Sequence, residues 1–192
     1  MDKGRLEAFS DGVIAVAITI MVLQIEPPHG TDLASLQPLL PAFLNYVLSF
    51  VYVGIYWSNH HHLLHAADHV SGAVLWANLH LLFWLTLIPF ATAWMGAHDT
   101  EALPAAVYGV VLLMAAVAYF ILARTLVRLH GTSSRIGRAI GRDWKTRLSA
   151  VAYIVAIVLA FIVSARVADA LYLLVALVWL VPDRRIERRA VS

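Results

Sequence analysis

Residues 104–126, PAAVYGVVLLMAAVAYFILARTL, decide the fold of this chain, because only one side chain in the stretch, Arg124, is charged. An α-helix of roughly 20 apolar residues crosses the hydrocarbon core of a bilayer, which is about 30 Å thick. The whole chain of 192 residues is 61% hydrophobic and 14% charged, against about 25% charged residues in soluble domains. Lipid is therefore the expected main solvent of this protein.

Hydropathy predicts five further membrane helices around this one. Turn residues separate them: Pro27 and Pro28 follow the first helix, residues 96–100 precede the stretch above, and Pro182 follows the last helix. The six expected helices are residues 9–25, 39–62, 73–95, 104–126, 148–167 and 170–181. We therefore expect an all-α, polytopic membrane protein with six transmembrane helices in a single domain, residues 1–192.

The positive charges are unevenly distributed along the chain. All but one of the 14 lysines and arginines lie before the first helix, around the connection between the fourth and fifth helices, or after the sixth. Positively charged loops stay in the cytoplasm, so we predict a multi-pass protein of the cell membrane with both termini cytoplasmic. The exception, Arg166, is expected to pair with Asp169 at the outer end of the last two helices. The basic connector 128–147 is expected to contact anionic lipid head groups or water rather than nucleic acid.

Asp11 stands out because it lies at the start of an apolar helix. An ionised carboxylate at the edge of a bilayer costs several kcal/mol unless it finds a partner. One interpretation is an N-cap, in which Ser10 or Asp11 satisfies the first free amides of the helix. The other is a hydrogen-bonded network that joins this helix to its neighbours. The sequence leaves both open.

The first helix carries one apolar stripe. At 100° per residue, Val16, Ile20 and Leu23 fall within about 60° of one another. Beside the stripe lie the small side chains of Gly12, Ala15 and Thr19, which allow close approach of another helix. Contact with lipid or ordinary helix packing explains such a stripe without any further function.

Residues 57–80 are rich in polar aromatic side chains. His61, His65 and His69 repeat every four residues, so they share a helix face and are candidate ligands of a metal or a haem. The alternative is that most of these histidines lie in water at the cytoplasmic end, while His60, Asn78 and His80 face inward and bond to the Asp11 segment. Catalytic motifs are absent from the sequence and there is no cysteine, so we expect neither an enzyme nor a thiolate metal site.

Four segments together resemble the bacterial branch of the endolysosomal potassium channel family, transmembrane protein 175. They are RLEAFSDGVIAVAITIMVLQI at 5–25, GIYWSNHHHLLH at 54–65, LWANLHLLFW at 75–84 and LVWLVPDRRIE at 177–187. The hallmark of the family is an arginine, three residues and then Phe-Ser-Asp, matched here by Arg5, Phe9, Ser10 and Asp11. The chain has no TVGYG-like filter sequence of ordinary potassium channels.

The resemblance implies a homotetramer in which helix 1 of each subunit lines a central pore for monovalent cations. It implies a hydrophobic constriction at Val16, Ile20 and Leu23, with the hydroxyl of Thr19 beside the pore. Potassium is then the permeant ion, with weak to moderate selectivity over sodium, and no cofactor or metal site is expected. The expected partners are further copies of the chain and the lipid bilayer.

In this interpretation the polar residues around Asp11 form a structural network that fixes the tilt of helix 1. Its expected members are Arg5, Phe9, Ser10, Asp11, Asn59, His60, Trp76, Asn78 and His80. Two other functions stay open from the residues alone: a histidine-rich membrane protein that binds haem or transports a transition metal, and a membrane scaffold in which the stripe only packs subunits together.

Overall fold

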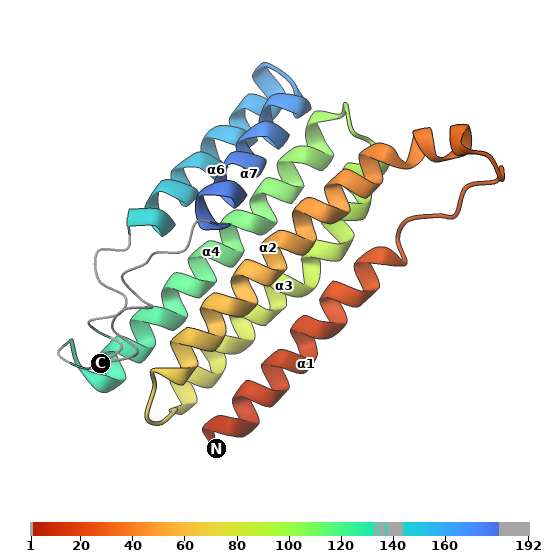
Figure 1. The fold of residues 1–192 in the computed structure, drawn as a ribbon. Coiled ribbons are helices and arrows are strands. Elements are labelled where there is room, and N and C mark those ends of the chain that lie inside the picture. The colour runs from red at the N-terminus through yellow and green to blue at the C-terminus, as the bar shows by residue number, and fades with distance from the viewer. Residues whose placement is uncertain (1, 133, 135–136, 138–143, 181–192) are drawn as a thin grey trace.

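The computed structural model describes residues 2–132, 134, 137 and 144–180, and every regular element in these ranges is helical. This confirms the predicted all-α fold (Figure 1). The elements are α1 (Lys3–Val22), the 3₁₀-helix η1 (Leu33–Leu39), α2 (Leu40–His65), α3 (Gly72–Ala97), α4 (Ala102–His130), α6 (Trp144–Ile162) and α7 (Ala165–Leu180).

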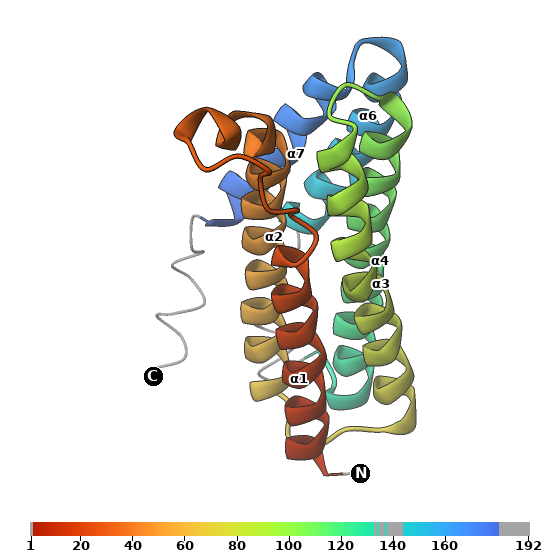
Figure 2. The ribbon, with the colours of Figure 1, turned by 90° about the vertical axis from the view of Figure 1, so that its right-hand side faces the viewer.

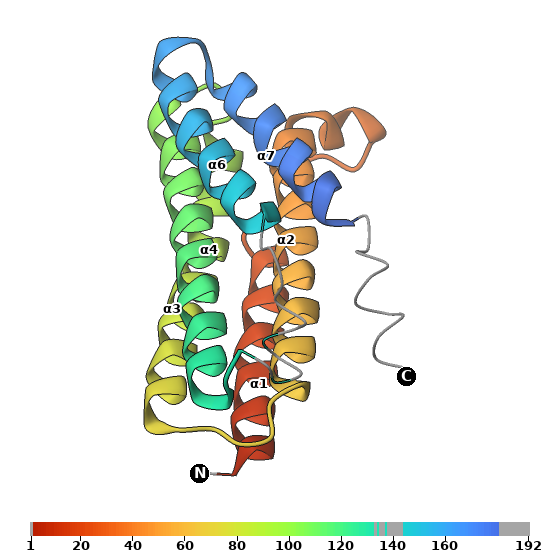
Figure 3. The same cartoon turned by 90° about the vertical axis from the view of Figure 1, so that its left-hand side faces the viewer.

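The long helices α2, α3 and α4 form the middle of the bundle. On one side α1 packs against α2 and α3, and on the other side α6 and α7 pack against α4 (Figures 1 and 3). The first turn of α1, the turn between α2 and α3 and the C-terminal end of α4 all lie at one end of the bundle, far from α6 and α7 (Figure 2). Lys3, in the first turn of α1, and Arg128, in the last turn of α4, therefore share that end although they are distant in sequence.

The first helix begins earlier than hydropathy predicts. It starts at Lys3 rather than at residue 9, and the side chain of Asp2 caps it by accepting a hydrogen bond from the Gly4 amide at 3.3 Å. Ser10 and Asp11 therefore lie inside the helix, and the N-cap interpretation of these two residues is wrong. The physical reason is that the first two turns are charged on their exposed side, so a hydropathy window does not register them.

The boundary between the last two helices also differs from the prediction. α6 ends at Ile162 and α7 begins at Ala165, so the break falls near Ser164 rather than at residues 168–169. The predicted ion pair is wrong as well: Arg166 is exposed, and Oδ1 of Asp169 is buried without a hydrogen-bond partner among the described residues. The long arginine side chain keeps its charge in contact with solvent instead of following the carboxylate inward.

Four stretches of the described helices are long and apolar enough to cross a membrane, namely Leu33–His65, Gly72–Ala97, Ala102–His130 and Lys145–Ile162. α1 is not among them, since Lys3, Arg5, Glu7 and Asp11 occupy its first half. α7 has 16 residues, which is about 24 Å at 1.5 Å per residue and short for a full crossing. Six crossings therefore stay a prediction.

Buried tyrosines hold α2, α4 and α7 together. The Tyr52 hydroxyl donates to the Tyr172 carbonyl at 2.6 Å, and the Tyr172 hydroxyl donates to the Ala105 carbonyl at 3.0 Å. Tyr108 completes the group, with its hydroxyl 2.9 Å from that of Ser49. Such bonds satisfy polar groups that lipid and apolar side chains cannot satisfy, so they fix these helices against one another.

Candidate functional site: the first helix and its polar anchor

α1 has one buried face and one uncovered face. The buried residues follow a helical spacing and are Leu6, Ser10, Ile14, Ala17 and Met21. They point at α2 and α3, which are the helices that α1 packs against. A helix of this kind is held by a single narrow stripe.

The uncovered face carries the predicted apolar stripe. Val16 is 58% exposed, Ile20 37% and Leu23 78%, so no other helix among the described residues fully covers them. Thr19 is exposed between them, and its hydroxyl donates to the Val16 carbonyl at 3.0 Å. That bond uses the hydroxyl hydrogen and leaves the oxygen able to accept a bond or to face a cation.

A groove of about 490 Å³ runs along the same side of α1. Its lining is Ala8, Phe9, Gly12, Val13, Val16, Ala17, Ile20 and, from α3, Thr86. The hydroxyl of Thr86 donates to the Phe83 carbonyl of its own helix at 2.8 Å, so the groove is almost entirely apolar. An uncovered apolar groove beside a membrane helix is suited to contact with lipid or with another protein helix.

A buried chain of hydrogen bonds joins α1 to α2 and α3. The Ser10 hydroxyl donates to the Leu6 carbonyl at 2.8 Å, and the Asn78 amide nitrogen donates to the Ser10 oxygen at 2.9 Å. Oδ1 of Asn78 lies 2.7 Å from Nε2 of His60. Because that oxygen can only accept, Nε2 of His60 carries the hydrogen. All three side chains are buried, so this chain, the polar anchor, fixes the rotation of α1.

Asp11 lies outside the polar anchor. It is exposed, and its Oδ1 accepts a hydrogen bond from the indole nitrogen of Trp57 at 3.0 Å. This bond differs from the prediction, which gave Asp11 partners among Asn59, His60, Trp76, Asn78 and His80. The sequence does contain a signal for this bond. The indole N–H of a tryptophan is a donor that needs an acceptor, and Trp57 lies three residues before His60 on the same helix.

The other residues of the expected network are not brought together. Arg5 and Phe9 are exposed, and Trp76 is 75% exposed. His80 accepts a hydrogen bond from Trp84, one turn further along α3, at 3.0 Å. Asn59 lines a separate cavity of about 30 Å³ between α2, α4, α6 and α7.

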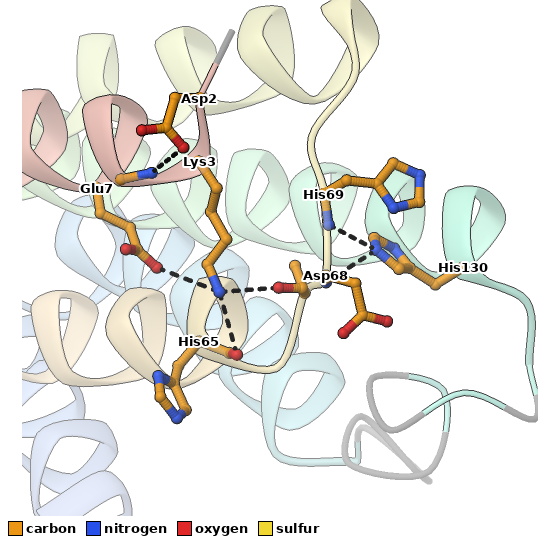
Figure 4. Close-up of polar contacts among 9 residues, drawn as sticks. Asp2, Lys3, Glu7, His65, Asp68, His69 and His130 are labelled. Carbon is orange, nitrogen blue, oxygen red and sulfur yellow. Dashed lines mark hydrogen bonds and ion pairs between the residues drawn. The ribbon is translucent and has the colours of Figure 1, made fainter.

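The first turn of α1 has a second attachment, which was not predicted from the sequence. Nζ of Lys3 donates to the Ala67 carbonyl at 2.8 Å and to the His65 carbonyl at 3.3 Å, and it lies 3.8 Å from Glu7 (Figure 4). A cation at the C-terminal end of α2 interacts favourably with the carbonyls that the helix leaves free. No sequence pattern marks main-chain acceptors of this kind.

The described residues contain no group of three or more His, Asp or Glu side chains placed to hold a metal ion. The rings of His61 and His65 stack with centroids 5.9 Å apart, and both side chains are exposed. His61 and His65 share a face of α2, but α2 ends at His65 and His69 lies in the turn beyond it. The prediction that all three histidines share a helix face is therefore wrong.

The sequence of this chain is similar to those of proteins named as potassium channels. The family model described as "Endosomal/lysosomal potassium channel TMEM175" matches residues 5–89. A protein of Chryseobacterium sp. (strain P1-3) named as a potassium channel is 52% identical over 98% of this chain and 97% of its own length. A potassium channel of Streptomyces collinus is 34% identical over 84% of each chain. These relatives are named as channels and not as enzymes.

The fold matches a solved structure. It is the crystal structure of a lysosomal potassium-selective channel TMEM175 homolog from Chamaesiphon minutus, with a TM-score of 0.80 and 29% identity over 93% of this chain and 96% of that one. The human endosomal/lysosomal proton channel TMEM175 is 36% identical over 43% of this chain, but the match covers only 19% of the human protein.

Proposed function

The chain belongs to the TMEM175 family of potassium channels, and from this premise we propose that it is a potassium-permeable cation channel with α1 lining the pore. The observation that carries the proposal is the division of α1 into two faces. One face is fixed to α2 and α3 by the polar anchor, and the other presents Val16, Ile20 and Leu23 uncovered.

The proposed channel is a homotetramer in which four α1 helices surround one axis. Closed symmetric assembly places the same surface of every copy in the same environment, so one uncovered face per chain becomes a continuous lining. The groove of about 490 Å³ beside α1 supports this arrangement, because its apolar walls are suited to a helix of a neighbouring copy.

The proposed constriction works through hydration. Rings of Val16, Ile20 and Leu23 narrow the axis until a cation must lose part of its water, and dewetting of the same rings closes the path. Potassium holds its water less tightly than sodium, so an apolar neck favours potassium weakly to moderately. The exposed oxygen of Thr19 supplies a polar contact beside the neck.

We place the channel in the cell membrane as a multi-pass protein with both termini cytoplasmic. The support is that Lys3 and Arg5 lie at the same end of the bundle as the basic C-terminal end of α4 (Figure 2). Positive charge gathered at one end of a membrane bundle marks the cytoplasmic side. The remaining basic residues of the predicted cytoplasmic segments lie mostly outside the described residues.

Ion flux from liposomes that contain the purified protein tests this function. Potassium efflux is expected to exceed sodium efflux, and Leu23→Ala is expected to lower the potassium to sodium ratio several-fold by widening the neck. Ile162→Ala is the matched control, since Ile162 is equally uncovered, at 73% exposed, but lies at the end of α6. Flux no greater than in protein-free liposomes contradicts the proposal, and an unchanged ratio in Leu23→Ala removes Leu23 from the constriction.

A further inference from the structure

A single peptide group connects α1 to α4 at the basic end of the bundle. The carbonyl of Ala67 accepts the hydrogen bond from Nζ of Lys3 at 2.8 Å, and the amide of Asp68, on the other side of the same peptide bond, donates to Nε2 of His130 at 3.2 Å (Figure 4). The amide of His69 donates to the same nitrogen at 3.4 Å. The turn between α2 and α3 therefore bridges the first turn of α1 and the last residue of α4.

This arrangement defines the protonation state of His130. Its Nδ1 lies 3.0 Å from the Leu126 carbonyl, which can only accept, so Nδ1 carries a hydrogen. Its Nε2 faces two backbone amides, which can only donate, so Nε2 must offer a lone pair. The imidazole is therefore neutral. A protonated ring could not accept the hydrogen bonds from the amides of Asp68 and His69.

The bonds on the two sides of the peptide support each other. The ammonium group of Lys3 withdraws electron density from the Ala67 carbonyl, which makes the Asp68 amide a stronger donor toward His130. Loss of the bond on the His130 side weakens the bond on the Lys3 side for the same reason. The last turn of α4 and the first turn of α1 thus share one continuous hydrogen-bond chain.

We propose that His130 is a proton-sensitive latch: when its ring gains a proton, the turn between α2 and α3 separates from α4 and the attachment of α1 at Lys3 shifts. Histidine changes its charge between about pH 5 and pH 8, within the range that cells experience. The consequence for conduction rests on the proposed function, whereas the latch itself does not.

Charged or titratable groups of the described residues lie on both sides of the turn that His130 contacts. The His69 ring lies with its centroid 4.6 Å from that of His130. The others are Asp68 on the same turn, His65 at the end of α2, and Lys3 and Glu7 on α1 (Figure 4).

Hydrogen exchange of the full chain in lipid nanodiscs at pH 7.5 and pH 5.5 tests the latch. After correction for the intrinsic effect of pH, the amides of Asp68 and His69 are expected to exchange about fivefold to tenfold faster at the lower pH, as loss of their bonds implies. In His130→Gln the side-chain oxygen accepts at both pH values, so exchange should be slow at both. In His130→Phe no acceptor remains, so exchange should be fast at both.

The matched control is His69→Gln, which removes the adjacent ring but keeps both amides and the acceptor, and which should retain the pH response. Equal exchange of the wild type at the two pH values overturns the latch, and so does a pH response that survives in His130→Gln.

Potassium flux measured on the same proteins separates the latch from the channel. The pH response of flux is expected in the wild type and should be lost in His130→Gln. If flux is absent from every variant, the proposed function fails while the exchange data still decide the latch. If exchange responds to pH and flux does not, the coupling to α1 is overturned.

Discussion

The helices α2, α4 and α7 are held together in a different way from α1, which packs against α2 and α3. In the interior, tyrosine hydroxyls from Tyr52 and Tyr172 bond to main-chain carbonyls, and the rings are fully buried. At α1, small and medium side chains pack on one side only, and the polar anchor consists of three side chains in series. The interior is surrounded by helices, whereas α1 has an uncovered face along its whole length.

This difference indicates a division of labour within the chain. Side-chain bonds to the main chain inside a close-packed interior leave the helices little freedom to slide. A helix that is held along one stripe can rotate or tilt if that stripe is altered. The uncovered face, rather than the tyrosine interior, is therefore where we expect differences in conduction to arise.

The largest expected effect comes from adding a methyl group at Gly109, among the buried tyrosines between α2, α4 and α7. A Cβ added at Gly109 meets the hydroxyl of Tyr172 and comes within 2.7 Å of the Ile157 side chain. Gly109→Ala should therefore lower the free energy of unfolding by about 3 kcal/mol, the upper part of the usual range for overpacking. Thermal unfolding in detergent measures the loss. Gly54→Ala is the control, because nothing lies within 4 Å of its added Cβ.

If Gly109→Ala unfolds at the wild-type temperature, the interior is not the rigid part of the molecule and the contrast with α1 disappears.

A smaller but more local effect is expected at the polar anchor. Asn78→Leu leaves Ser10 and His60 without their bonds to the amide, which should cost about 2 kcal/mol. Hydrogen exchange should accelerate in α1 and remain unchanged in α4 and α7. His80→Leu, on the same helix, removes only a bond to Trp84 of that helix and should leave α1 unchanged. Equal acceleration in all helices argues against a separately attached α1.

The smallest effect is expected at Asp11. Trp57→Phe removes the indole hydrogen bond to an exposed carboxylate, so the free energy of unfolding should fall by only about 0.5–1 kcal/mol. Trp76→Phe is the control, because Trp76 is 75% exposed. Denaturant titration resolves the difference. A loss as large as that of Asn78→Leu makes Asp11, and not Ser10, the main attachment of α1.

Much of the fold follows from composition, because the length of an apolar stretch is a property of the sequence alone. The polar residues that the anchor needs, Ser10, His60 and Asn78, were also identifiable as side chains too polar for lipid. Their pairing was not, since it depends on how α1 is rotated against α2 and α3, and only tertiary packing sets that rotation. The prediction therefore includes Asn78 among the partners of Asp11, whereas Asn78 bonds to Ser10 and Asp11 bonds to Trp57.

Three further features were not predicted from the sequence. The start of α1 at Lys3 depends on a cap by Asp2 and on charged residues that hydropathy counts as loop. The link from Lys3 through the Ala67–Asp68 peptide to His130 uses main-chain groups, which every residue carries. The break near Ser164 contains neither glycine nor proline and so was placed a few residues too late.

The most direct test of the central claim uses the absence of cysteine from the chain. Ile20→Cys places a single thiol on the uncovered face of α1, and Leu173→Cys places one on α7, where Leu173 is 50% exposed. A positively charged methanethiosulfonate reagent should abolish most potassium flux through Ile20→Cys and leave Leu173→Cys unaffected. Complete modification of Ile20→Cys with undiminished flux would show that this face of α1 does not line the pore.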